Sequence, residues 1–175
     1  MFMEWFMDAF TKNIIWSQFG ASIDALEQAV QMYPDELWGD PAKLSEAWHE
    51  PWYMTYHTLF WLEFYLHGSK EGFMPKEPYG LSEFDPAGVL PDRIYSKAEM
   101  LAYLHHCRQK CNSTIESLTD QGARRVCKFG WGEMSFAELL LYNMRHVQHH
   151  TAQLNLILRS RIDNAPPWVF RAKAS

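Results

Sequence analysis

The chain has 175 residues, of which 47% are apolar and 15% are aromatic, a composition typical of a globular protein with a substantial core. Sixteen basic residues against 21 acidic ones give a formal charge of −5. This balance excludes the broad basic surface with which proteins bind nucleic acid. No apolar stretch reaches the roughly 18 to 20 residues that a membrane-spanning helix needs, so we expect no membrane partner either.

The length predicts a single domain over residues 1–175, with a core at about 8–162 and an extended tail at 163–175. The start of the chain carries Glu4 and Asp8 and lacks a basic region. These features argue against a signal peptide.

Three cysteines, an odd number without a Cys-x-x-Cys spacing, indicate a reducing compartment. We therefore expect a cytoplasmic protein in which the cysteines are small core residues. Cys107 and Cys111 share one helical face, so metal binding or oxidation at this pair is the alternative.

Apolar residues recur at helical spacing in four segments, which predicts an all-α fold without strands. The second helix should begin near Pro51, a residue tolerated in a first helical turn, and stop at Gly68. The third and fourth helices each begin with a serine three residues before a glutamate, the spacing of a capping box. The expected helices cover about 10–32, 51–67, 96–118 and 135–162.

A segment of nearly thirty residues, about 68–95, separates the second and third helices and is rich in Gly, Pro and aromatic residues. Antiparallel neighbours in a bundle need only about 2 to 8 connecting residues. The length therefore predicts a four-helix bundle in which a long crossover leaves the second and third helices parallel. Long ordered loops of this kind often cover a functional site.

Three histidines lie on the core-facing stripes of their helices: His57 in the second helix, and His146 and His150 in the fourth. A step of four residues rotates a helix by about 40° and advances it by about 6 Å, so His146 and His150 can reach one ion. An unpaired buried imidazole costs about 1–3 kcal/mol. Three neutral imidazoles also leave positions open on a divalent ion, as in catalytic sites. We predict a shared metal ion; hydrogen-bonded core histidines are the alternative.

Polar and aromatic residues near these histidines are candidates for supporting roles. Asn143 lies one turn before His146 and Gln153 lies near His150, so both are expected to support the ligands through hydrogen bonds. Tyr53 and Trp61, one turn on either side of His57, are candidate pocket walls, with core packing as the alternative.

Arg124 and Arg125, in the connection before the fourth helix, are candidates for holding an anionic substrate group, with a solvated loop as the alternative. Val147 stands where an HExxH zinc protease carries its general-base glutamate, which excludes that class. A di-iron bundle needs two Glu-x-x-His motifs, and the sequence has one. No catalytic residue is assigned.

The segment HVQHHTAQL, residues 146–154, is similar to the His-x-x-His-His-x-x-Gln-Leu signature of the DinB-like family, also called DinB/YfiT-like. His57, followed by TLFWLEFYL, matches the family's histidine in the second helix, and the resemblance covers roughly residues 8–162. It implies an up-down-down-up four-helix bundle, often a homodimer. It also implies one divalent ion, zinc, nickel or iron, at His57, His146 and His150.

Two functions are open. The resemblance implies a metal-dependent enzyme that activates a low-molecular-weight thiol, such as bacillithiol or mycothiol, or water. Such an enzyme would be a thiol S-transferase or a hydrolase that acts on a small electrophilic substrate. The alternative is a non-catalytic, stress-associated protein that binds a metal or a small ligand.

Overall fold

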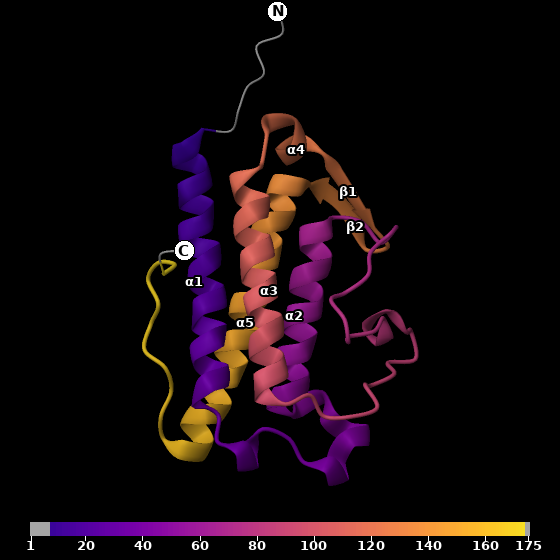
Figure 1. Ribbon diagram of the computed structural model, residues 1–175, viewed down its shortest axis with the longest axis vertical. Helices are drawn as coiled ribbons and strands as arrows, with labels where there is room; N and C mark the ends of the chain where they lie inside the picture. The colour runs from indigo at the N-terminus through magenta and orange to yellow at the C-terminus, as the bar shows by residue number, and fades with distance from the viewer. Residues whose placement is uncertain (1–7, 174–175) are drawn as a thin grey trace, which may run out of the picture.

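The computed structural model describes residues 8–173 of the chain, so Glu4 lies outside the described residues. Four long helices pack side by side, with contacts between α1 and α5, α2 and α5, α1 and α3, and α2 and α3. Figure 1 shows that α2 and α3 run in the same direction, opposite to α1 and α5. The predominantly helical fold predicted above is confirmed. The four helices are α1 (Ala9–Met32), α2 (Pro51–His67), α3 (Lys97–Glu116) and α5 (Phe136–Ile162).

The helix ends follow local signals in the sequence. Ser96 and Glu99 form a reciprocal capping box at the start of α3, and the Ser135 side chain accepts from the backbone N–H of Glu138 at the start of α5. Pro51 opens α2, and Gly68 ends it in the left-handed conformation at φ 83°, which a residue without Cβ adopts at little cost. These ends fix which residues of α2 and α5 face each other.

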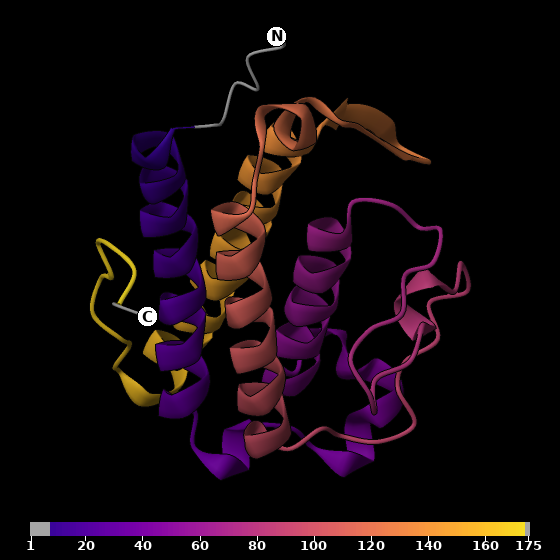
Figure 2. The same cartoon turned by 45° about the horizontal axis from the view of Figure 1, so that its top comes forward.

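The connections between α1 and α2, and between α2 and α3, contain short 3-10 turns: η1 (Asp35–Leu37), η2 (Pro41–His49) and η3 (Ser82–Phe84). The crossover 68–96 runs back along the outside of the bundle beside α2 (Figure 2). Phe73 and Phe84 in this segment pack their rings against Phe60 and Phe64 of α2. This aromatic contact holds η3 against α2.

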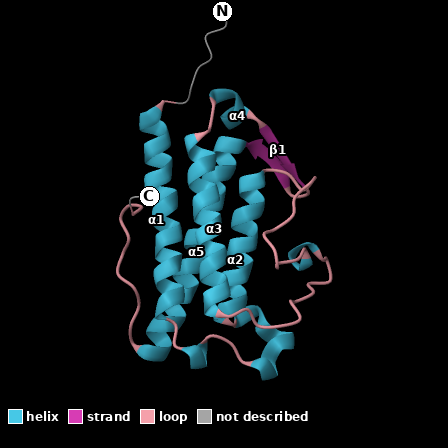
Figure 3. Cartoon of the chain, viewed as in Figure 1, coloured by secondary structure: helices cyan, strands magenta, loops and turns pink. Residues whose placement is uncertain are grey.

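The expectation of a fold without strands was wrong. After a short helix, α4 (Asp120–Arg124), the strands β1 (Val126–Phe129) and β2 (Gly132–Ser135) form an antiparallel hairpin (Figure 3). Each strand has four residues, and β1 buries only Cys127, so the sequence shows no sustained alternation of apolar and polar residues.

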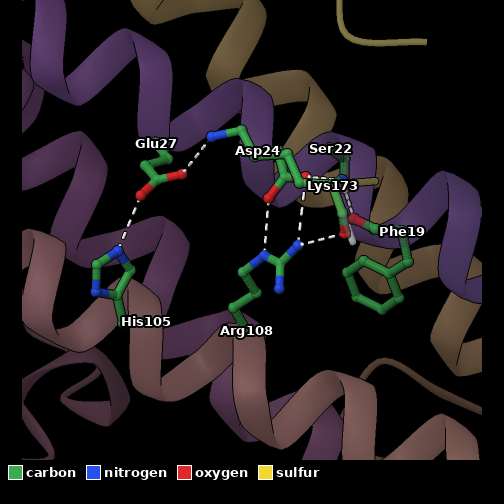
Figure 4. A network of polar contacts seen from close by, with 7 residues as sticks. All are labelled: Phe19, Ser22, Asp24, Glu27, His105, Arg108 and Lys173. Atoms are coloured by element: carbon green, nitrogen blue, oxygen red, sulfur yellow. Dashed lines mark hydrogen bonds and ion pairs between the residues drawn. The ribbon is translucent and has the colours of Figure 1, made fainter. Parts of the chain in front are cut away.

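Residues 164–173, called the strap below, lie against α1 in an extended conformation. The N–H of Ala172 donates to the carbonyl oxygen of Ser17, and a Cβ added at Gly20 would stand 2.6 Å from the Ala172 Cβ. Gly20 is therefore required for the close approach. Figure 4 shows the polar network that fixes the strap: the fully buried Asp24 accepts from Arg108 of α3 and from the N–H of Lys173.

No helix among residues 8–173 is both long enough and apolar enough to cross a membrane. The three cysteines are buried and unpaired. Burial raises the pKa of the Cys107 and Cys111 thiols, so these side chains are poor thiolate ligands and poor targets for oxidation.

Candidate metal centre

The helices α2 and α5 bring His57, His146 and His150 together, although 89 residues separate the first two in sequence. Their ligand nitrogens all lie within 4.8 Å of one another. Among the residues that the structure describes, this is the cluster of histidine, cysteine or acidic side chains with the geometry of a metal site. His146 and His150, both on α5, are also in ring contact, with centroids 4.6 Å apart.

The hydrogen bonds of the imidazoles decide which nitrogen atoms are free. His57 Nδ1 lies 2.7 Å from Glu83 Oε2, and a carboxylate accepts, so Nδ1 carries the proton and Nε2 has a free lone pair. His150 Nδ1 lies 2.7 Å from the Gln153 side-chain oxygen, which leaves His150 Nε2 free in the same way. Both histidines therefore present Nε2 to the centre of the cluster.

No tautomer of His146 gives both of its nitrogens a hydrogen-bond partner among the described residues. Its Nε2 lies 3.4 Å from His57 Nε2, and its Nδ1 is buried without a hydrogen-bond partner among the described residues. If Nδ1 carries the proton, two lone pairs face each other; if Nε2 carries it, Nδ1 is a buried acceptor without a donor. A divalent ion between the Nε2 atoms removes the repulsion between the lone pairs.

The distance between these nitrogens also fits a metal. Two imidazole nitrogens at about 2.0–2.1 Å from a tetrahedral ion lie roughly 3.3–3.4 Å apart, and the observed separation of the His57 and His146 Nε2 atoms is 3.4 Å. The residues present therefore fit one divalent ion with imidazole ligands, and imidazole suits zinc, nickel and iron alike.

The surroundings keep His146 and His150 neutral. Burial, together with the neighbouring imidazoles, lowers the pKa of His146 to about 3 and that of His150 to about 4. Neutral imidazole is the form that binds a metal. At neutral pH the cluster is therefore ready to act as a ligand set.

Glu83, on η3 of the crossover, supports His57 and was not singled out from the sequence. Its carboxylate has a side-chain exposure of 5% and accepts from His57, from the Tyr53 hydroxyl at 2.7 Å and from Trp61 Nε1 at 2.8 Å. Burial alone would raise the pKa of Glu83, but these hydrogen bonds, above all the one from His57, lower it below its usual value. Glu83 therefore stays ionised and fixes the His57 tautomer.

The structure places the other predicted residues as follows. Gln153 contacts His150 as expected, whereas Asn143 donates to the Leu62 carbonyl oxygen and hydrogen-bonds to none of the imidazoles. Tyr53 and Trp61 lie beside His57, with their polar atoms on Glu83.

The two arginines in the connection before α5 lie apart from the histidines. The Arg125 guanidinium packs over the Phe136 ring at 4.3 Å, and Arg124 lines a cavity with Asp120 and Ser135. Neither arginine lines the cavity that adjoins His146.

Comparisons with known proteins agree with this fold. A search of curated proteins found no match. A crystal structure of a DinB-like protein, YjoA, from Bacillus subtilis is similar, with a TM-score of 0.60 at 15% identity, over 92% of this chain and 100% of that one. The family model described as the DinB superfamily matches residues 18–154, a range that contains His57, Glu83, His146 and His150. The chain belongs to the DinB superfamily.

Proposed function

We propose that the protein is a metal-dependent enzyme in which His57, His146 and His150 hold one divalent ion. The observation that supports this most is the convergence of three imidazoles whose ligand nitrogens lie within 4.8 Å of one another, two of them kept neutral by burial. An ion held there supplies a Lewis acid that lowers the pKa of a thiol or water molecule in its open positions. The nucleophile would then be transferred to, or would hydrolyse, a small electrophilic substrate.

Within this proposal each supporting residue has a defined task. Glu83 holds the proton on His57 Nδ1, and Gln153 holds the proton on His150 Nδ1, so both Nε2 atoms keep the same orientation. Glu83 already accepts from three donors, so it is poorly placed to take a proton from water. This favours a thiol nucleophile, which needs no separate base once it is ionised.

We further propose that the four long helices form the up-down-down-up bundle of the family and that the protein acts in the cytoplasm as a homodimer. Three unpaired cysteines suit a reducing compartment. Large apolar side chains project from α1 and the strap, where Phe10 is 74% exposed and Phe170 is 69% exposed. Light scattering after size exclusion tests the dimer, and a monomer at micromolar concentration would contradict it.

The first experiment is metal analysis by plasma mass spectrometry on untagged protein. We expect near one equivalent of zinc, nickel or iron in wild type and loss of that metal in His57→Ala and in His146→Ala. His149→Ala is the matched control, because His149 lies on the same helix and is exposed. Metal retained in both ligand variants would show that these histidines are packing residues and would remove the enzyme proposal.

The second experiment separates an enzyme that uses thiols from a protein that only stores metal. We expect bacillithiol or mycothiol to raise the melting temperature of the metal-loaded protein, because only a ligand that prefers the folded state stabilises it. The S-methylated thiols, which cannot ionise, are the control. Equal shifts with free and methylated thiols, or with metal-free protein, would contradict activation at the metal.

A further inference from the structure

A cavity of about 490 Å³ adjoins the three-histidine cluster along α5. This volume falls within the range of about 300–1,000 Å³ that small-molecule sites occupy. Its lining includes His146, which also belongs to the cluster, and His149, whose ring centroid lies 5.1 Å from that of His150. The remaining lining residues are Tyr142, Arg145, Gln148 and Ala152.

Arg145 supplies a positive charge to this cavity that no described residue neutralises. It forms no hydrogen bond or ion pair with any residue from 8 to 173. By contrast, Arg93 and Arg108 each contact a carboxylate of the chain. A guanidinium presents paired donors in a fixed plane, which match the two oxygens of a carboxylate as they match those of a phosphate.

The same cavity has an apolar wall, the ring of Tyr142, which an aromatic stack holds in place. The Tyr142 ring stacks on Trp131 with centroids 5.1 Å apart and an angle of 22°, and Trp131 in turn stacks on Phe129 at 5.1 Å and 8°. The Tyr65 ring meets Tyr142 edge-on at 86°. The hairpin and α2 therefore hold the Tyr142 ring in place. A rigid ring of this kind offers a flat apolar surface on which a flat apolar ligand can pack.

We propose that this cavity binds a small ligand with a flat apolar body and one carboxylate. The carboxylate lies on Arg145, and the apolar body lies against Tyr142 beside His146. The inference rests on the proposed function, for which it names the substrate class: a planar electrophile that carries a carboxylate, bound next to the metal rather than on it. Arg145 and Tyr142 set the specificity.

Binding of 4-fluorobenzoate, followed by ¹⁹F NMR line width in a titration of zinc-loaded protein, tests this. We expect Arg145→Gln to raise the dissociation constant about tenfold or more, the effect of losing one charge-assisted hydrogen bond. Arg159→Gln, on the same helix with the same change of charge, should leave it unchanged. Tyr142→Leu should weaken both 4-fluorobenzoate and the neutral 4-fluorobenzamide, whereas Arg145→Gln should affect only the carboxylate.

The same titration on chelated protein separates this inference from the proposed function. Binding that persists without metal and depends on Arg145 supports the cavity even if metal analysis rules out the enzyme. Binding that vanishes on chelation and in His150→Ala, but is unchanged in Arg145→Gln, means that the carboxylate ligates the metal and overturns the inference. Equal binding of the carboxylate and the amide overturns it as well.

Discussion

Two polar clusters lie inside the same helical bundle and are built in opposite ways. Between α1 and α3, Asp24 is fully buried, and its carboxylate accepts from Arg108 and from the strap (Figure 4). Between α2 and α5, His146 has a buried nitrogen that finds no partner within residues 8–173, and two imidazole nitrogens face each other. A cluster that serves stability completes its own hydrogen bonds, whereas a cluster that awaits a ligand leaves them incomplete.

A second buried carboxylate, Glu63 on α2, follows the pattern of Asp24. Its carboxylate accepts from the Tyr103 hydroxyl, His106, Lys110 and the N–H of Lys76, at 2.8 to 3.0 Å. Burial acts to raise the pKa of Glu63, but these donors lower it below the usual value. The buried carboxylates Asp24 and Glu63 are therefore well supplied with donors, whereas the lack of a partner at His146 Nδ1 recurs at buried atoms of Gln28, Trp52, Asn143 and Asn155.

The largest expected effect comes from breaking the complete cluster. Arg108→Met leaves the Asp24 charge buried without its main partner and should lower the free energy of unfolding by about 3–5 kcal/mol. Urea denaturation followed by circular dichroism measures this. Lys173→Ala, which removes an ion pair to Glu27 from a half-exposed side chain, is the control and should cost less than about 1 kcal/mol. A loss below 1 kcal/mol for Arg108→Met would show that the pair does not stabilise the fold.

The next effect concerns Glu83, the carboxylate that supports His57 in the candidate metal site. Glu83→Gln removes the charge that fixes the His57 tautomer, so we expect metal affinity to fall about 10- to 100-fold. Competition with a chromophoric chelator measures the affinity. Glu99→Gln is the comparison, because the Glu99 carboxylate, in the first turn of α3, pairs with Arg93. This substitution should leave metal affinity unchanged. Equal affinities in Glu83→Gln and wild type would place Glu83 outside the metal site.

A smaller effect, of opposite sign, is expected from removing an imidazole. In metal-free protein, His146→Leu removes a buried nitrogen that has no partner and should raise the free energy of unfolding by about 1 kcal/mol, while it abolishes metal binding. Thermal denaturation in the presence of a chelator tests this. A clear loss of stability would mean that the imidazoles satisfy one another after all.

The remaining prediction concerns the dependence of stability on pH. Because the pKa values of His146 and His150 in the folded state, about 3 and about 4, lie below the unfolded value of about 6.5, the unfolded chain binds more protons in this interval. The metal-free protein should therefore lose stability as the pH falls from about 6.5 toward 4. His146→Leu should show a shallower loss over that interval, and parallel curves for the two proteins would contradict the assignment.

Much of the fold was predictable because its signals are local. Pro51, Gly68 and the Ser135 cap mark helix ends with chemistry that acts within a few residues. The hairpin was missed because its strands are short and largely exposed, so its stability comes from contacts such as Trp131 on Tyr142, which no local pattern shows.

The candidate site divides along the same line. Two histidines one turn apart on α5 are visible in the sequence, and the core stripe of α2 points to His57. Glu83 was not predictable, because the crossover carries several acidic residues and only the aromatic packing of η3 on α2 selects one of them. Asn143 faces inward, as the sequence predicted, but its side-chain amide donates to the Leu62 carbonyl oxygen and to no imidazole. The position of a backbone carbonyl on another helix is not visible in the sequence.

The proposed ligand set draws on segments far apart in the chain. His57 and Glu83 are 26 residues apart, and His57 and His146 are 89 residues apart. No fragment that folds early in synthesis holds the set, so an ion can be captured only after the last helix has docked. Metal release during denaturation should then coincide with the loss of helical signal, and retained metal becomes a quantitative record of how many molecules in a preparation have finished folding.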